Sequence, residues 1–269
     1  MDFSNTEEQQ MLQESVQKFV QKSYDFDTRT QIIASEKGFS QENWDLFAEL
    51  GWLTVPFREE DGGFGGSAVD LAVMMEEFGK AMLVEPFIAG AVLSGGVISE
   101  QGSAQQKAEL LPKIMEGKLQ LACAYAEPGS RFNLAHIKTS AIVTGDTVVL
   151  NGSKTAVLNG SNAEILLVVA RESGAATDSE GISVFMVDAA STGVTIQAFA
   201  NVDGKKSAEI SLKDVSVPVT QRLGASGSAL QALQNSVDRA TLAVSAEAVG
   251  AMESLLHKTV EYSKTRKQF

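Results

Sequence analysis

The spacing of apolar residues changes character twice along the chain. In the first part apolar residues recur at intervals of three and four, which is typical of amphipathic helices. The middle part has short runs rich in valine, isoleucine and threonine between turn residues, and these runs indicate strands. The last part returns to the helical spacing. We therefore predict a helical domain over residues 1–118, a β domain over residues 119–224 and the start of a second helical domain over residues 225–269.

Capping residues locate the helices of the first part. The first helix is expected to begin after Ser4 or Asn5, because Glu7 and Glu8 would then lie in its first turn, where the helix dipole favours carboxylates. Further helices are predicted after Ser40, after Ser67, over Phe87–Ser99 and after Ser103, which forms a capping box with Gln106.

The middle part is predicted to be an antiparallel sandwich or barrel. No helix of useful length separates its strands, so the crossovers that join parallel strands are not expected. The turn Thr144–Asp146 is predicted to close a hairpin, and Leu150–Ala170, taken alone, indicates a second hairpin. The predicted strands are Leu119–Ala126, His136–Val143, Val148–Asn151, Ile165–Val169, Ile182–Val187, Val194–Phe199 and Ala208–Leu212.

The final helix carries apolar or small residues on most of its surface, so it needs other helices to cover it. The chain supplies none after it. We expect either that another subunit covers this helix, or that the chain is a fragment truncated at its C-terminal end. One charged pair, Asp238 beside Arg239, interrupts the helix near the start of its small-residue run.

Composition narrows the class of function. The 269-residue chain has a formal net charge of -12, so nucleic acid or an anionic membrane would be repelled on average. One cysteine and two histidines give no cluster with zinc-ligand spacing, and no metal site is predicted. The acidic N-terminus lacks a secretory signal, and the longest strongly apolar run, Ile165–Ala170, is too short to span a bilayer. A soluble cytoplasmic protein is expected.

Two glycine-containing motifs are ambiguous when each is taken alone. Gly63, Gly65 and Ala68 nearly match the dinucleotide fingerprint, but the alternating strands and helices that normally surround it are missing. A connection between helices is therefore favoured, and NAD is not predicted. The Glu-Pro-Gly at Glu127–Gly129 ends a strand, because Pro128 has no N–H for a sheet. Its freed backbone groups could face a ligand, but taken alone an ordinary β-turn is favoured.

The motifs together resemble those of the acyl-CoA dehydrogenase family along the whole chain. The helical part contains Asp-Gly-Gly-Phe-Gly-Gly, and the β part begins with a strand that ends in Glu127–Gly129. Gly152–Gly160 follows the family pattern Gly-x-Lys-x-x-x-x-Asn-Gly. The long helix carries the run Arg239–Gly250, and the chain ends in Tyr-x-x-x-Arg-x-Gln-Phe. The resemblance implies an α+β multidomain fold with an N-terminal all-α domain, a middle antiparallel β-sandwich or barrel domain and a C-terminal helical bundle.

The resemblance implies FAD as cofactor. The flavin ring would lie against the strand before Glu-Pro-Gly and against the strand of the Lys-x-x-x-x-Asn-Gly motif. The family often has Trp-Ile-Thr or Trp-Ile-Ser in the second strand, so Ala-Val-Leu here leaves backbone N–H groups to bond the flavin. The C-terminal end of a neighbouring subunit would bind the nucleotide part of FAD, which implies an oligomer, either a dimer or a tetramer. The implied FAD-binding residues are Tyr125, Ala126, Ala156, Val157 and Leu158, with Arg266, Gln268 and Phe269 contributed across the oligomer.

The implied substrate is an acyl-CoA, and three charged residues are candidates for acting on it. Arg131 either binds a phosphate or is a solvated loop residue. Some family members place the catalytic base directly before the helix arginine, and here that position is Asp238, with Arg239 on the CoA side. Three alternatives stay open: Asp238 is a helix-start carboxylate, it is a structural partner of an arginine, or the base lies in the absent C-terminal part.

The implied activity removes hydrogens from Cα and Cβ of an acyl-CoA thioester and gives a trans-2-enoyl-CoA. Electrons would pass to an electron-transferring flavoprotein. Two other functions stay open. One is a non-catalytic subunit of a hetero-oligomer, which the absence of Trp and Thr beside the flavin favours. The other is an acyl-CoA oxidase, in which oxygen reaches the reduced flavin.

Overall fold

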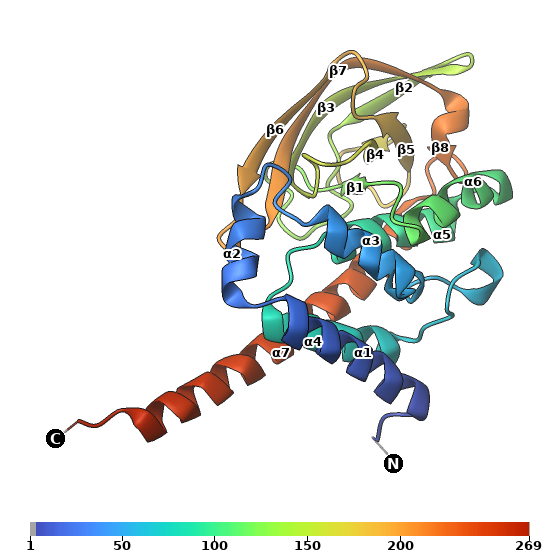
Figure 1. Cartoon of the computed structure of the whole chain (residues 1–269). Helices are drawn as coiled ribbons and strands as arrows, with labels where there is room; N and C mark the ends of the chain where they lie inside the picture. The colour runs from blue at the N-terminus through green and yellow to red at the C-terminus, as the bar shows by residue number, and fades with distance from the viewer. Residues whose placement is uncertain (1–3, 269) are drawn as a thin grey trace.

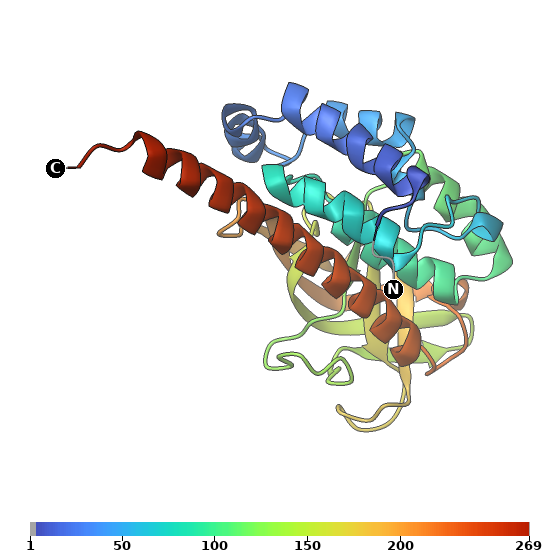
Figure 2. The same ribbon diagram turned by 90° about the horizontal axis from the view of Figure 1, so that it is seen from below.

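The computed structural model describes residues 4–268 and places a group of helices against one curved sheet (Figure 1). The predicted α+β architecture is confirmed: helices come first, the sheet follows, and the long helix α7 runs back past the N-terminal helices (Figures 1 and 2). The N-terminal elements are α1 Glu7–Ser23, α2 Phe26–Ala34, α3 Gln41–Glu49, η1 Trp52–Thr54, η2 Glu59–Asp61, α4 Ala68–Ala81, η3 Ile88–Ser94, α5 Gly95–Gln101 and α6 Ala104–Met115.

The first helix begins slightly later than expected. Thr6, rather than Ser4 or Asn5, caps α1, because its side-chain oxygen accepts from the backbone N–H of Gln9 at 3.2 Å. The Gln9 side chain in turn accepts from the N–H of Thr6 at 3.0 Å, which completes a capping box. The other predicted helix starts are confirmed, since side-chain caps are present at Ser40, Ser67 and Ser103.

Two helical segments differ from the sequence prediction. The short helix α2 follows Asp25, whose side chain accepts from the N–H of Thr28 at 2.7 Å. Its weak amphipathic pattern gave no signal. The segment predicted over Phe87–Ser99 begins as the π-helical η3, which is buried along its whole length, and continues as the α-helix α5. A π-helix is wider than an α-helix and is not visible in residue spacing.

Aromatic side chains fill the core of the helical part. The ring centroid of Phe47 lies 5.3 Å from that of Phe19, 4.8 Å from that of Trp52 and 5.5 Å from that of Phe78. The pair with Phe19 is edge-on, an arrangement that the aromatic quadrupole favours. Phe78 continues the cluster to Phe87, at 5.5 Å. The cluster therefore joins α1, α3 and α4 to the start of η3.

The middle part is an eight-stranded, mainly antiparallel sheet. Its strand order is β6-β7-β3-β2-β4-β5-β8, and β1 pairs with β4. The exceptions to the predicted antiparallel arrangement are β1 beside β4 and a single bridge between β2 and β4, which are parallel. The strands are β1 Leu121–Ala124, β2 Ser140–Thr144, β3 Thr147–Leu158, β4 Ile165–Arg171, β5 Ile182–Asp188, β6 Val194–Ala200, β7 Lys206–Pro218 and β8 Arg222–Leu223.

One of the two predicted hairpins is present. The strands β2 and β3 pair across Gly145, whose φ of +60° suits a tight turn. The hairpin prediction for Leu150–Ala170 is wrong, because β2 lies between β3 and β4 in the sheet. Instead β3 runs on through Gly152, with irregularities in its pairing to β7.

Small residues of α7, Leu230–Thr265, allow it to approach α4 closely. A Cβ atom at Gly79 of α4 would lie 1.9 Å from the carbonyl oxygen of Glu247, and one at Gly250 of α7 would lie 1.8 Å from that of Glu76. The alanine, serine and glycine run in the sequence therefore serves helix packing. The buried residues of this face are Ala232, Leu233, Ser236, Ala243, Ala246 and Gly250.

The C-terminal half of α7 projects away from the other elements (Figure 2). Its large apolar side chains are exposed, including Met252, Leu255 and Leu256. The prediction of an uncovered apolar surface on this helix is confirmed for the single chain. Over residues 4–268, no helix is long and apolar enough to cross a membrane.

Candidate functional site

The segment directly after β1 and the last residues of β3 lie side by side and carry five of the predicted flavin residues. The backbone N–H of Thr155 donates to the carbonyl of Ala126 at 2.9 Å and joins the two segments. Surfaces on both segments are accessible, since Ala126 is half-buried and Ala156 is exposed. The structure therefore brings together Tyr125, Ala126, Ala156, Val157 and Leu158.

A bulge in β3 shapes this surface. Ala156 has a φ of +49°, and the pairing of β3 with β7 shifts between Lys154 and Val157. Glu209 of β7 stabilises the bulge: its Oε1 accepts from the Thr155 hydroxyl at 2.7 Å and lies 3.5 Å from the backbone nitrogen of Ala156. One N–H predicted to be available to the flavin therefore faces a carboxylate. No sequence motif points to Glu209, because its place depends on the register of β7 against β3.

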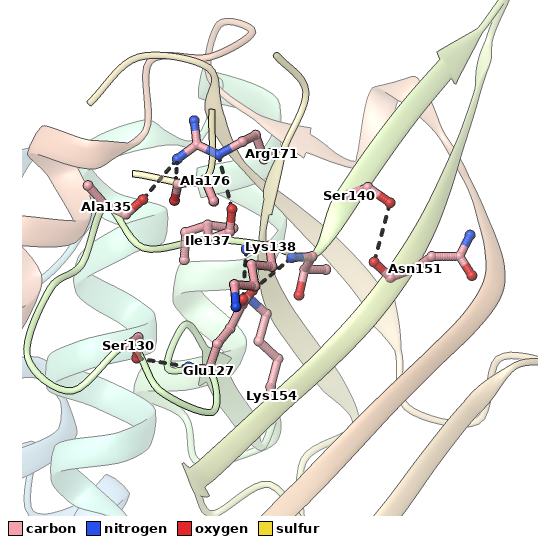
Figure 3. Close-up of polar contacts among 11 residues, drawn as sticks. Glu127, Ser130, Ala135, Ile137, Lys138, Ser140, Asn151, Lys154, Arg171 and Ala176 are labelled. Atoms are coloured by element: carbon pink, nitrogen blue, oxygen red, sulfur yellow. Dashed lines mark hydrogen bonds and ion pairs between the residues drawn. The ribbon is translucent and has the colours of Figure 1, made fainter. Parts of the chain in front are cut away.

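Glu127 and Lys154 form a buried ion pair (Figure 3). Oε1 of Glu127 accepts from Nζ of Lys154 at 2.7 Å and from the N–H of Thr139 at 3.0 Å, while Oε2 accepts from the N–H of Lys138 at 2.7 Å. The Lys154 side chain is 0% exposed and that of Glu127 is 3% exposed. One carboxylate therefore connects the end of β1, the start of β2 and the middle of β3. This role explains the glutamate of Glu-Pro-Gly better than an isolated turn does.

Burial and mutual attraction shift the pKa values of both members of this pair. Burial acts to raise the pKa of Glu127, but Lys154 and the N–H donors outweigh it and hold the pKa below its usual value. Burial lowers the pKa of Lys154 to about 8, and the attraction of Glu127 acts in the opposite direction. A pKa of about 8 leaves the ammonium mostly protonated at pH 7.

Arg171 of β4 anchors the loop between Glu-Pro-Gly and β2 (Figure 3). Its guanidinium is buried and donates to backbone carbonyls, including those of Ile137 at 3.0 Å, Ala135 at 2.8 Å and Ala176 at 3.3 Å. A buried cation needs such partners to offset its lost hydration. Sequence reasoning missed Arg171, because an arginine at a strand end is typical of a solvated surface.

A cavity of about 200 Å³ lies where the three parts of the chain meet. Leu158 of β3 lines one side, and Val244 and Glu247 of α7 line another. Its lining is mainly apolar and aromatic with a few polar groups, which is typical of small-molecule sites. The helical domain contributes residues that include Phe47, Met75, Phe78, Val84, Glu85 and Phe87.

Asp238 lies more than two turns inside α7, which begins at Leu230. The helix dipole acts mainly within the first turn, so the interpretation of Asp238 as a helix-start carboxylate is wrong. Within residues 4–268 it forms no ion pair, so the structural-partner interpretation finds no support there. The side chain is exposed, 3.4 Å from Nε2 of Gln234. It shares its exposed face with Thr241, Leu242, Ser245 and Val249.

Arg239 turns toward the helical domain instead. It is half-buried, and its Nη2 donates to the carbonyl of Pro56 at 2.9 Å. Burial lowers the pKa of Arg239, against the attraction of Glu100. The contact fixes the rotation of α7 and leaves Asp238 on the outer face. A role on the CoA side stays a prediction.

The remaining predicted residues lie apart from the cavity. Arg131 is exposed, with a φ of +50°. Arg266 and Gln268 are exposed at the projecting end of α7 (Figure 1), and the Arg266 guanidinium bonds the hydroxyl of Tyr262 one turn earlier. Phe269 lies outside the described residues. One chain does not bring these groups to β1 and β3, so a role at the flavin requires a second copy.

Comparison with known proteins identifies the family. Residues 6–118 match the N-terminal domain of acyl-CoA dehydrogenase, and residues 122–215 match its middle domain. The chain belongs to the acyl-CoA dehydrogenase family. It is 30% identical to acyl-CoA dehydrogenase FadE12 of Mycobacterium tuberculosis, over 98% of this chain and 69% of that protein.

Solved structures share the acyl-CoA dehydrogenase fold of this chain. Butyryl-CoA dehydrogenase from Megasphaera elsdenii matches with a TM-score of 0.89 and 28% identity, over 100% of this chain and 72% of that one. A structure of PigA with FAD and proline matches with a TM-score of 0.90 and 28% identity, over 100% of this chain and 71% of that one. This family member therefore spans 69–72% of the length of the three relatives.

The acyl-CoA dehydrogenase family is FAD-dependent, and the surface at β1 and β3 fits a flat ring system. The small side chain of Ala156 is exposed beside half-buried Ala126, so no bulky group covers the junction of the two segments. Gly129, in the adjoining turn, has nothing within 4 Å of the place where a Cβ would lie, which leaves room beside its backbone. In the described part of the chain, no group of His, Cys, Asp and Glu residues could hold a metal ion.

Proposed function

We propose that this protein is an FAD-dependent acyl-CoA dehydrogenase that forms a trans-2-enoyl-CoA and passes electrons to an electron-transferring flavoprotein. The observation that carries the proposal is the shared cavity. Leu158 of the proposed flavin strand and Val244 of α7 line it together with the aromatic residues of the helical domain. An acyl group in this cavity would lie between the flavin strand and the face of α7 that carries Val244 and Glu247, whereas Asp238 does not line the cavity.

The reaction divides between these elements. Tyr125, Ala126 and the bulged segment Ala156–Leu158 would hold FAD, which when bound supplies an acceptor for a hydride from Cβ. The carboxylate of Asp238 takes the proton from Cα, and the electron pair of the broken Cα–H bond forms the new double bond as the hydride leaves. Asp238 is exposed in the single chain and does not line the cavity, so Cα would have to reach it at the outer face of α7.

The remaining predicted residues are assigned to CoA and to the FAD of a second copy. Exposed Arg131 is available for a phosphate of CoA. Arg239 would contact CoA with donors other than the one that bonds Pro56. Arg266, Gln268 and Phe269 would meet the FAD of a second copy. The names of butyryl-CoA dehydrogenase and FadE12 support an acyl-CoA substrate, and the PigA structure with FAD supports the cofactor.

Substitution of Asp238 by Asn tests the base. We expect the rate at which acyl-CoA bleaches bound flavin to fall by about 100-fold or more, because the amide cannot accept the proton. The matched control is Glu253→Gln, which changes a carboxylate of the same helix that does not line the cavity and is paired with Lys80 at 3.1 Å. Its bleaching rate should stay within a few-fold of wild type. An Asp238→Asn variant that keeps most of the wild-type bleaching rate would show that Asp238 is not the base.

The unsubstituted full-length protein distinguishes the competing functions. A yellow protein whose flavin is bleached by an acyl-CoA, and recovers when an electron-transferring flavoprotein is added, agrees with a dehydrogenase. Rapid recovery in air without that partner would indicate an oxidase. Failure of every acyl-CoA to bleach the flavin would indicate a non-catalytic subunit.

A further inference from the structure

We propose that Glu85 determines the specificity of the cavity and selects a short acyl group with a hydrogen-bond donor, a hydroxyl or protonated amine, near its far end. The inference rests on the proposed function, because it takes the cavity as the acyl site. It adds the chemical class of the acyl group, which the family match leaves open.

The size of the cavity limits the acyl group. A protein cavity of about 150 Å³ lined by apolar side chains holds a benzene molecule. The volume of about 200 Å³ is only slightly larger, and the cavity opens at a rim that includes exposed Lys37 and Asp203, so it limits the buried end of an acyl group. Phe47, Phe78 and Phe87 belong to the packed aromatic core, so this side of the cavity cannot widen at low cost. An acyl chain that extends past these phenylalanines would have to displace them.

The carboxylate of Glu85 is an unusual group in such a wall. Glu85 is 5% exposed, yet it lines the cavity beside Val84 and Phe87. Burying a carboxylate is unfavourable unless hydrogen bonds compensate. Tyr24 donates its hydroxyl to Oε2 at 3.0 Å, and Asn43 donates from Nδ2 to Oε1 at 2.8 Å. Tyr24 is held in turn, because the N–H of Val84 donates to its hydroxyl oxygen at 3.1 Å.

These contacts fix the position of Glu85 before any ligand binds. Burial raises the pKa of Glu85, and the donors Asn43 and Tyr24, with the backbone N–H groups of Ser40 and Glu85 itself, act in the opposite direction. Glu85 lines the cavity, whereas Tyr24 and Asn43 do not. A donor from an acyl group in the cavity would bond this carboxylate, whereas a methyl group in the same place would not.

The other charged groups of the cavity are less buried or already engaged. Lys205 pairs with Glu247 at 2.6 Å, and Nζ of Lys37 bonds Gln41 at 3.1 Å. Asp203 and Lys37 are exposed, and Lys206 is partly exposed. These groups therefore belong to the rim, where water screens them. Glu85 is the deeply buried charge among the lining residues, so it has the largest effect on what binds there.

Paired ligands test the inference through binding. The probes are butyryl-CoA and hexanoyl-CoA, compared with the 4-hydroxybutyryl and 6-hydroxyhexanoyl thioesters, with octanoyl-CoA as a length control. Dissociation constants come from calorimetry and from the change in flavin absorbance of the full-length protein with FAD. We expect at least one hydroxyacyl thioester to bind about tenfold or more tightly than its plain partner, because a site built around a polar group discriminates strongly against an analogue that lacks it. Octanoyl-CoA should bind more weakly than hexanoyl-CoA.

Two substitutions at Glu85 assign the preference to this residue. Glu85→Leu should abolish the hydroxyacyl preference, and Glu85→Gln, which keeps the shape of the side chain, should reduce it. The matched control is Glu77→Gln: Glu77 is also a buried glutamate of the helical domain, bonded to Gln13 and Lys80, but it does not line the cavity. This control should keep the wild-type ratio.

The outcomes separate the two proposals. Tight binding and flavin bleaching by plain acyl-CoAs with no hydroxyacyl preference would overturn the role of Glu85 and leave the proposed function intact. An unchanged ratio in Glu85→Gln would overturn it as well, even if Glu85→Leu does not fold. If no thioester binds, both proposals fail.

Discussion

Substitution of Gly250 by Val is expected to lower the free energy of unfolding by about 3 kcal/mol, at the upper end of the usual cost of overpacking. A Cβ at this position would lie 1.8 Å from the carbonyl oxygen of Glu76, so α7 and α4 would have to separate. Backbone atoms cannot move aside as a flexible side chain can. Urea unfolding measures the loss, and faster hydrogen exchange of α7 amides would locate it.

A second substitution on the same helix controls for the effect of valine on helix formation. Ala248 is exposed, so Ala248→Val adds a comparable side chain outside the contact with α4. Its cost should stay below about 1 kcal/mol, the range of intrinsic helix propensity. Equal stability losses in the two variants would contradict the close packing of α4 and α7 at Gly250.

The sequence predicted the features of the fold that depend on neighbouring residues. The cap at Ser67 and the hairpin across Gly145 are confirmed because both need only a few adjacent residues. The hairpin over Leu150–Ala170 failed because strand pairing is not local: β2, which comes earlier in the chain, lies between β3 and β4. The tight contact of α4 and α7 is also non-local. The glycine and alanine content of α7 indicates close packing but does not identify α4 as its partner.

The candidate site was predictable in part. The motifs pointed to Ala126 and Ala156, which the structure places on joined segments. The ion pair that holds these segments together could not be predicted from the sequence, because Glu127 and Lys154 are 27 residues apart and meet only in the folded sheet. The cavity was equally hidden, since its walls come from three parts of the chain. Glu85 gave no signal for that reason.

The second large effect is expected at the buried ion pair. Substitution of Lys154 by Met leaves the carboxylate of Glu127 without its ammonium partner, and removing one member of a buried pair typically costs about 3–5 kcal/mol. Two N–H donors, from Lys138 and Thr139, remain and should hold the loss near the lower end of this range. Urea unfolding measures it. The matched control is Lys118→Met, because Lys118 pairs with Glu116 at 2.8 Å while 72% of its side chain is exposed. That variant should stay within about 0.5 kcal/mol of wild type.

The double variant Glu127→Gln with Lys154→Met separates the cost of an unpaired charge from the cost of lost packing. Because this variant leaves no carboxylate without its ammonium partner, its loss of stability should be smaller than the sum of the two single losses. FAD affinity gives an independent measure, because the pair holds the end of β1 beside the bulge of β3. We expect both single variants to bind FAD more weakly than the Lys118 control. Wild-type stability and wild-type FAD affinity in Lys154→Met would show that the pair neither stabilises the sheet nor positions the flavin surface, and the backbone bond between Thr155 and Ala126 would then be sufficient.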